Sequence, residues 1–190
     1  MTQNVAASVH QRLLNLARAE GRPFNELLQY YALERFLYRL GRSPHRDRLV
    51  LKGALMFGAW DAPFPRPTRD IDLLGRMPNE VDVVTITLRD VCEQPVQDDG
   101  LRFATETVVG ERVALAADYA GVRVRFTAYL GSAHIPMQID VGFGDQIVPG
   151  AVPVRLPTLL DFPPPEVHGY SRESAIAEKL PPPISSRPRA

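Results

Sequence analysis

A change in hydrophobic period constrains the fold of this chain more than any other feature. Before residue 41 the apolar residues recur at spacings of three and four, as in amphipathic helices. From Leu101 onward they alternate with polar residues, most clearly over residues 122–127, where valine and phenylalanine alternate with arginine and threonine. This alternation predicts a β-meander with strands near 101–109, 111–118, 121–130 and 136–143.

The first half of the chain is expected to mix helices with short strands. The patterns predict helices over 5–20, 25–40, 55–60 and 79–93, strands over 49–51 and 69–74, and a proline-rich loop over 61–68. Residues 149–168 show no firm period and are expected to be irregular, before a helix over 171–180 that ends at Pro181. The fold class is therefore α+β (mixed α/β), a twisted mixed sheet flanked by helices with an N-terminal helical pair. We expect a helical segment at 1–48, a catalytic core at 49–148 and a connection with a proline-rich tail at 149–190.

Composition excludes several classes of protein. The chain has 22 Lys and Arg against 22 Asp and Glu, so a nucleic acid would have to be bound by a local patch rather than by net charge. Cys92 is the single cysteine, which excludes an internal disulfide and a cysteine-based zinc site. No apolar run reaches the length of a signal peptide core or of a membrane span, so a cytoplasmic protein without a membrane partner is expected.

The acidic pair Asp70 and Asp72 is the sharpest chemical feature. Residues two apart on a strand share a face, so the two carboxylates are expected to lie side by side while Ile71 and Leu73 face the core. Two adjacent carboxylates favour a hard divalent cation such as Mg²⁺ or Mn²⁺, which also binds phosphate oxygens. Such a pair can also stand on a strand edge or a loop and bind nothing.

Two further elements fit the same chemistry. Asp140 lies in an otherwise apolar strand and must project opposite to its apolar neighbours, either to solvent or into a site. Lys52-Gly53-Ala54 follows a short apolar strand and precedes an expected helix, where a glycine turn lets backbone amides approach a triphosphate. Lys52 or Arg69 can add positive charge. An ordinary strand-to-helix turn is the alternative for this segment.

In order along the chain, these elements resemble the polymerase-beta-like nucleotidyltransferase superfamily. Four stretches sharpen the resemblance to the AbiEii/AbiGii toxin family, the nucleotidyltransferase toxins of toxin–antitoxin and phage-defence systems: residues 23–43, 49–75, 135–145 and 173–180. The superfamily's usual Gly-Gly or Gly-Ser turn is Gly53-Ala54 here, so the backbone alone is expected to contact phosphate.

The resemblance implies a reaction and roles for particular residues. An RNA 3′-hydroxyl, implied to be that of a transfer-RNA acceptor end, would attack the α-phosphorus of a nucleoside triphosphate and release pyrophosphate. Asp70, Asp72 and Asp140 would be the catalytic acids and metal ligands. Lys52, Gly53, Ala54, Arg69 and Lys179 would bind the nucleotide, and a cognate antitoxin is the implied protein partner.

Alternative interpretations remain at this point. The family usually continues after the motif that holds Lys179, whereas this chain ends in a proline-rich tail, so a truncated, non-catalytic remnant that binds the antitoxin is one alternative. A glycosyltransferase would explain the acidic pair but not Gly53 or Asp140. The arginines of 39–48 could bind RNA or end a solvated helix. Glu34 with Arg35 and Arg39 is expected to be an exposed helical charge pattern.

Overall fold

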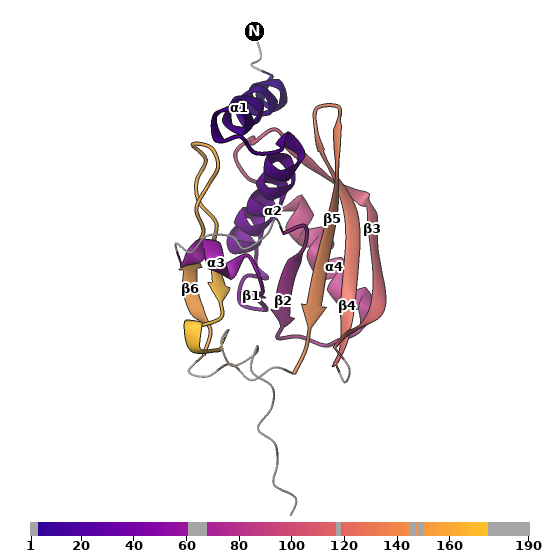
Figure 1. The fold of residues 1–190 in the computed structure, drawn as a ribbon. Coiled ribbons are helices and arrows are strands. Elements are labelled where there is room, and N and C mark those ends of the chain that lie inside the picture. The colour runs from indigo at the N-terminus through magenta and orange to yellow at the C-terminus, as the bar shows by residue number, and fades with distance from the viewer. Residues whose placement is uncertain (1–3, 61–67, 117–118, 145–146, 148–149, 175–190) are drawn as a thin grey trace, which may run out of the picture.

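The computed structural model describes residues 4–60, 68–116, 119–144, 147 and 150–174 (Figure 1). The helices are α1 (Val5–Glu20), α2 (Phe24–Arg42), α3 (Met56–Ala59) and α4 (Val81–Glu93). The strands are β1 (Leu49–Lys52), β2 (Ile71–Gly75), β3 (Leu101–Ala116), β4 (Tyr119–Leu130), β5 (Ala133–Gly142), β6 (Val152–Arg155) and β7 (Glu166–Gly169). None of the helices in these ranges is long and apolar enough to cross a membrane.

The strands form one seven-stranded sheet in the order β3-β4-β5-β2-β1-β7-β6. The β2–β5 and β1–β7 pairs are parallel, and the remaining neighbours are antiparallel. The predicted α+β class, with a mixed sheet and flanking helices, is therefore confirmed. The order places β5, β2 and β1 at the centre of the sheet, where β5 carries Asp140, β2 carries Asp72 and β1 carries Lys52.

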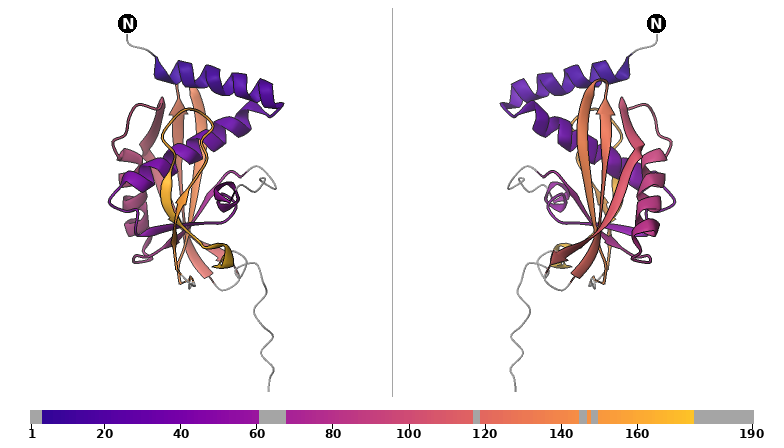
Figure 2. Two further views of the ribbon diagram at one scale, coloured as in Figure 1. Left: turned by 90° about the vertical axis from the view of Figure 1, so that its left-hand side faces the viewer. Right: turned by 90° about the vertical axis from the view of Figure 1, so that its right-hand side faces the viewer.

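One face of the sheet holds the main core. Ile71 and Leu73 of β2 and Ile139 of β5 are fully buried in one cluster with apolar residues of α2 and α4. Figure 2 shows α4 and α3 on opposite sides of the sheet. Because side chains alternate along a strand, the residues between these apolar positions point to the face away from α2 and α4. That face carries the polar residues considered below.

The structure corrects the prediction in two places. β3 is one long strand rather than two, with a register irregularity between Ala104 and Val109 where it pairs with β4. The segment 149–168, expected to be irregular, supplies strand β6 and most of β7, because only four residues of each strand enter the ladder and no period could reveal them. The loop at 61–67 and most of the helix at 171–180 lie outside the described residues.

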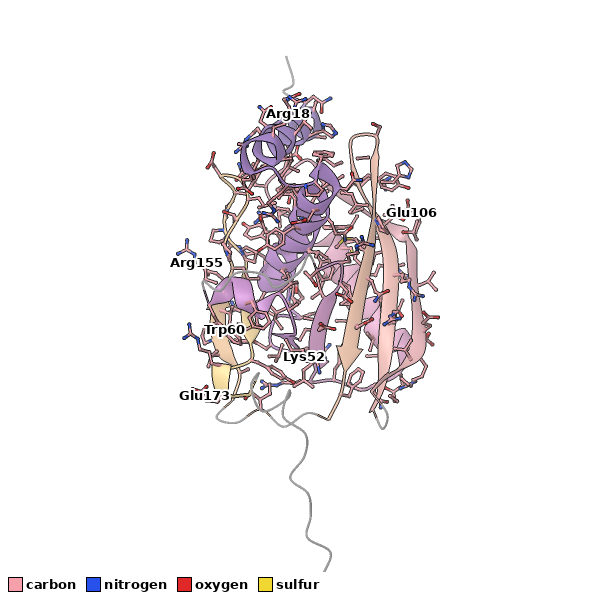
Figure 3. All side chains as sticks on the ribbon, viewed as in Figure 1. Arg18, Lys52, Trp60, Glu106, Arg155 and Glu173 are labelled. Carbon is pink, nitrogen blue, oxygen red and sulfur yellow. The ribbon has the colours of Figure 1, made fainter. Side chains whose placement is uncertain are left out.

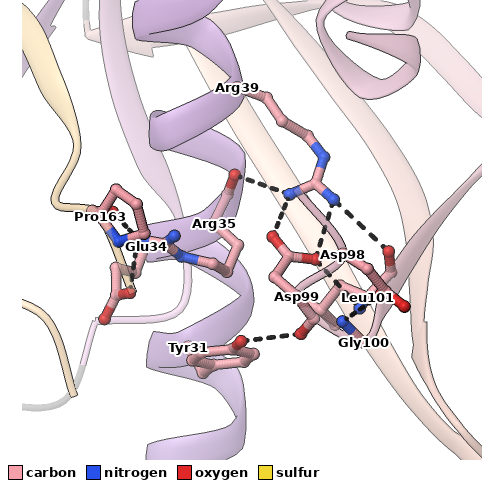
Figure 4. Close-up of polar contacts among 9 residues, drawn as sticks. All are labelled: Tyr31, Glu34, Arg35, Arg39, Asp98, Asp99, Gly100, Leu101 and Pro163. Atoms are coloured by element: carbon pink, nitrogen blue, oxygen red, sulfur yellow. Dashed lines mark hydrogen bonds and ion pairs between the residues drawn. The ribbon is translucent and has the colours of Figure 1, made fainter. Parts of the chain in front are cut away.

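The expectation of an exposed charge pattern at Glu34, Arg35 and Arg39 is wrong. These three residues are 3%, 1% and 6% exposed. Figure 4 shows Arg39 bound to Asp99 by two hydrogen bonds. Nη1 donates to Oδ2 at 2.7 Å, and Nη2 donates to Oδ1 at 3.0 Å. Tyr31 donates its hydroxyl to the Asp99 carbonyl at 2.8 Å. Arg39 therefore cannot contribute to a basic surface over 39–48.

The other two charged residues hold the segment that follows β6. Arg35 donates from Nη2 to the Pro163 carbonyl at 2.7 Å (Figure 4). The backbone N–H of Leu159 donates to Glu34 Oε2 at 2.8 Å. The Arg35 guanidinium also lies over the rings of Tyr38 and Phe162. Helix α2 is thus charged on a side that packs against protein, which hydrophobic periodicity cannot distinguish from a solvated side.

Candidate active site

The candidate site is a row of charged residues that crosses four adjacent strands. Strand register sets Lys52 of β1 opposite Asp72 of β2, Asp72 opposite Asp140 of β5, and Asp140 opposite Arg123 of β4. Residues directly opposite one another share a face, so the row reads positive, negative, negative, positive on the face away from α2 and α4. Figure 3 labels Lys52 on the part of the sheet where β1, β2 and β5 lie side by side.

Gly53 brings the turn after β1 against the second acid. Its φ of 72° lies in the left-handed region, which side chains with a β-carbon rarely adopt. A β-carbon at this position would also collide with the carboxylate and Cβ of Asp72. Glycine is therefore required here for two reasons: the backbone conformation is left-handed, and Asp72 fills the space that a β-carbon would need. The close approach seen here is to Asp72, and contact of this turn with a triphosphate stays a prediction. Helix α3 has only four residues and therefore little helix dipole to offer.

The first acid lies just before β2. The hydroxyl of Thr68 donates to Asp70 Oδ1 at 3.2 Å, and Asp70 is partly exposed. Arg69 is exposed, and its carbonyl accepts a hydrogen bond from Gln29 Nε2 at 3.4 Å. Since β1 and β2 are antiparallel, the residues that follow β1 and those that precede β2 lie at the same end of this pair. The turn at Gly53 and the acid Asp70 are therefore brought together.

The third acid is held by an arginine. Arg123 donates from Nε to Asp140 Oδ1 at 2.7 Å and from Nη2 to Oδ2 at 2.8 Å, a two-point contact with both carboxylate oxygens. Gln138 Nε2 adds a longer bond to Asp140 Oδ2 at 3.4 Å. The Asp140 hydrogen bond is the largest cause that raises the pKa of Arg123, and the charges of Glu111 and Asp70 act in the same direction. Asp70 is thus near enough to act electrostatically on Arg123.

Asp70 and Asp72 could bind Mg²⁺ together with substrate phosphates rather than as part of an all-protein site. Among the described residues, no three His, Cys, Asp or Glu side chains are grouped so that they could hold a metal ion by themselves. Magnesium is, however, commonly bound by one or two carboxylates together with substrate phosphates. Asp70 and Asp72 fit that arrangement, whereas both oxygens of Asp140 are engaged by Arg123. A three-carboxylate metal site stays a prediction.

A small apolar cluster adjoins the row on the same face. Val50, Leu74 and Tyr170 pack together, and Val50 and Leu74 are register partners two residues from Lys52 and Asp72. The Lys52 ammonium lies 5.9 Å from the centre of the Tyr170 ring, within cation–π range. Buried apolar side chains and an aromatic ring therefore lie beside the Lys52 end of the row.

Sequence reasoning missed Arg123, Thr68 and Tyr170. Arg123 was visible only as a polar member of the alternation in β4, and nothing in the sequence sets the register that pairs it with Asp140. Lys179, predicted to bind the nucleotide, lies outside the described residues.

One of the comparisons with known proteins identifies a family. The family described as "Nucleotidyl transferase AbiEii toxin, Type IV TA system" matches residues 35–181, more than half of the chain. The match covers every strand and every residue of the charged row. No curated protein and no solved structure matches the chain.

Proposed function

The chain belongs to the AbiEii family of nucleotidyl transferase toxins of type IV toxin–antitoxin systems, and from this premise we propose that it transfers a nucleotide to the 3′ end of an RNA. The family implies a nucleotide substrate and a cognate antitoxin. The finer proposal is that the substrate is a nucleoside triphosphate carried with Mg²⁺ or Mn²⁺, and that the acceptor is the 3′ end of a transfer RNA.

The observation that carries the proposal is the contact between Gly53 and Asp72 inside the charged row. The carboxylate of Asp72 fills the space directly beside the turn, and Gly53 itself is partly exposed next to it. A metal–triphosphate needs both features, since the carboxylate binds the cation and backbone amides approach the phosphates. Lys52, which is register partner of Asp72, supplies positive charge at the same place.

The proposed reaction assigns a role to each acid. The oxygen of the RNA 3′-hydroxyl forms a bond to the α-phosphorus, the bond from this phosphorus to the bridging oxygen breaks, and pyrophosphate leaves with the electron pair. Asp70 and Asp72 hold the cation with the triphosphate, and Asp140 assists removal of the hydroxyl proton. When bound, the metal ion neutralises charge on the phosphates. Holding both reactants in line supplies the largest part of such catalysis.

Metal-dependent nucleotide binding gives the first test. Calorimetry with each of the four nucleoside triphosphates, in Mg²⁺ and in EDTA, is expected to show binding only with the metal. Asp72→Asn should abolish it, because the amide no longer offers a charged ligand. The matched control is Asp82→Asn, which removes an exposed carboxylate in the first turn of α4. Equal binding in EDTA, or an unaffected Asp72→Asn protein, would refute the site.

Transfer gives the second test. Incubation with Mg²⁺, total bacterial RNA and triphosphates labelled at the α-phosphate is expected to label RNA at its 3′ ends. Oxidation of the RNA with periodate destroys the terminal diol and should prevent labelling. Labelling that survives this treatment would exclude the 3′-hydroxyl as the acceptor.

A further inference from the structure

Asp140 and Arg123 form the most complete polar contact on the candidate site face. The carboxylate of Asp140 is 7% exposed and the side chain of Arg123 is 28% exposed, so the acid is covered and the arginine forms part of the cover. Two-point contacts between arginine and carboxylate are strong and directional. An acid held in this way is not available to a cation or to a substrate hydroxyl unless the arginine moves.

Two further carboxylates, those of Glu111 and Asp70, also attract the positive charge of Arg123. Glu111 is its register partner on β3, and Asp70 contributes to its raised pKa. Asp140 is thus the carboxylate that Arg123 contacts, while Glu111, which pairs with Arg125, and Asp70 act on it only through their charge. A triphosphate would bring a larger negative charge to the same face, while its cation would compete for the carboxylates.

Resting on the function proposed above, we propose that Arg123 is a positioning residue that exchanges partners when the metal–nucleotide binds. Without nucleotide it occupies both oxygens of Asp140 and keeps the row neutral. With nucleotide it leaves Asp140 and donates to a phosphate oxygen, which frees the third acid beside the other two. The site is therefore completed by its substrate, and Arg123 opposes binding of the free cation but favours binding of the cation with triphosphate.

Two affinities with opposite expected changes test the exchange. In Arg123→Gln, Mn²⁺ alone, measured by calorimetry, should bind roughly threefold to tenfold more tightly, because a competing cation has been removed. The same variant should bind Mg²⁺ with a nucleoside triphosphate about tenfold more weakly, since one charge-assisted hydrogen bond to phosphate is lost. Arg125→Gln is the matched control, because Arg125 lies two residues along the same strand and contacts Glu111 and Gln138 instead of Asp140.

A second measurement uses the unaltered chain, in case the variant folds poorly with Asp140 unpaired. The Nε–H signal of Arg123 in a ¹⁵N spectrum, identified by its loss in Arg123→Lys, should shift when metal and triphosphate are added together. It should also shift in Asp140→Asn, which removes the charged acceptor. An Arg123 signal that is unmoved by nucleotide at saturation would show that the ion pair is purely structural.

The outcomes separate this inference from the function on which it rests. If Asp72→Asn abolishes nucleotide binding while Arg123→Gln changes neither affinity, the exchange is refuted and the proposed function stands. Parallel changes of both affinities in Arg123→Gln would also refute the exchange, because they would show an effect on the whole site. The Mn²⁺ measurement requires no nucleotide, so it decides the competition even if the proposed function fails.

Discussion

Gly53 shows how one residue can be fixed by two separate demands. Gly131, in the turn between β4 and β5, has a similar φ of 58°, but no atom lies within 4 Å of the place where its β-carbon would be. The two glycines thus share the backbone demand and differ in the presence of Asp72. This difference allows the contribution of the acid to be measured by itself.

We predict that Gly53→Ala and Gly131→Ala differ in nucleotide binding more than in stability. Gly131→Ala should lower the free energy of unfolding by about 1–2 kcal/mol, the cost of a left-handed conformation for a residue with a β-carbon. Gly53→Ala should lose more than this and should weaken metal–nucleotide binding by at least about tenfold, because Asp72 must move away. Urea unfolding and calorimetry measure the two effects. Equal nucleotide affinities would contradict the assigned role of the contact.

Glu34 gives a prediction about pH. Burial raises its pKa from 4.5 to about 7, against the opposing effects of Arg35 and the Leu159 N–H. Between these two values the folded chain holds a proton that the unfolded chain has released, so the free energy of unfolding should fall as the pH rises through this range. The total loss attributable to this group is roughly 3 kcal/mol, at about 1.4 kcal/mol for each unit of pKa.

Urea unfolding from about pH 5 to about pH 8 measures this loss. Glu34→Gln, which cannot titrate, should show a smaller decline over the same range. Glu80→Gln serves as the control, because Glu80 is exposed before α4 and its side chain makes no capping hydrogen bond there. A decline of the same size in the Glu34→Gln protein would show that other groups cause it.

At the scale of elements, α2 is joined to the start of β3 by a buried ion pair. Arg39 and Asp99 are 7% and 2% exposed at their side chains, and the same Asp99 also accepts the backbone N–H of Leu101 at 3.2 Å. We predict that Asp99→Asn lowers the free energy of unfolding by about 3–5 kcal/mol, since it leaves Arg39 buried without a countercharge.

Denaturant unfolding checks the value, with Arg102→Gln as a comparison. Arg102 pairs with Glu106 on the surface of the same strand, at side-chain exposures of 61% and 65%, and its loss should leave stability nearly unchanged. Similar losses of unfolding free energy in the two variants would mean that burial does not explain the contribution of the Arg39–Asp99 pair.

The elements also show how far sequence patterns reach. Helices α1, α2 and α4 and strands β4 and β5 were predictable, because their apolar residues follow one period over many positions. Strand β1 is as short as β6 and β7 but was predictable from its unbroken apolar run, Leu49-Val50-Leu51. β6 and β7 were not, since four residues are too few to establish an alternation. In the candidate site, Asp70, Asp72, Asp140 and Gly53 were found from residue type and spacing. Arg123 was not, because its importance comes from strand register, which depends on contacts between distant parts of the chain.

At the scale of the whole molecule, we expect the chain to unfold in a single cooperative step. The main core runs without interruption from α1 and α2 through the central strands to β7. The chain has one tryptophan, Trp60, directly after α3 and packed against this core. We predict that Trp60 fluorescence and far-ultraviolet circular dichroism report the same midpoint in urea. Two separate midpoints would show that the region around α3 unfolds independently of the sheet.

The position of the parallel β2–β5 pair has a consequence for how the site is assembled. β2 belongs to the half of the chain that ends with α4, and β5 belongs to the half that begins with β3. Each half carries two members of the charged row. Lys52 and Asp72 come from the first half, Arg123 and Asp140 from the second. Each half therefore brings its own countercharge, so β2 and β5 can pair without forcing two bare carboxylates together. If the gene were divided between the two halves, neither product would hold both Asp72 and Asp140, and nucleotide binding would show that the two products had assembled.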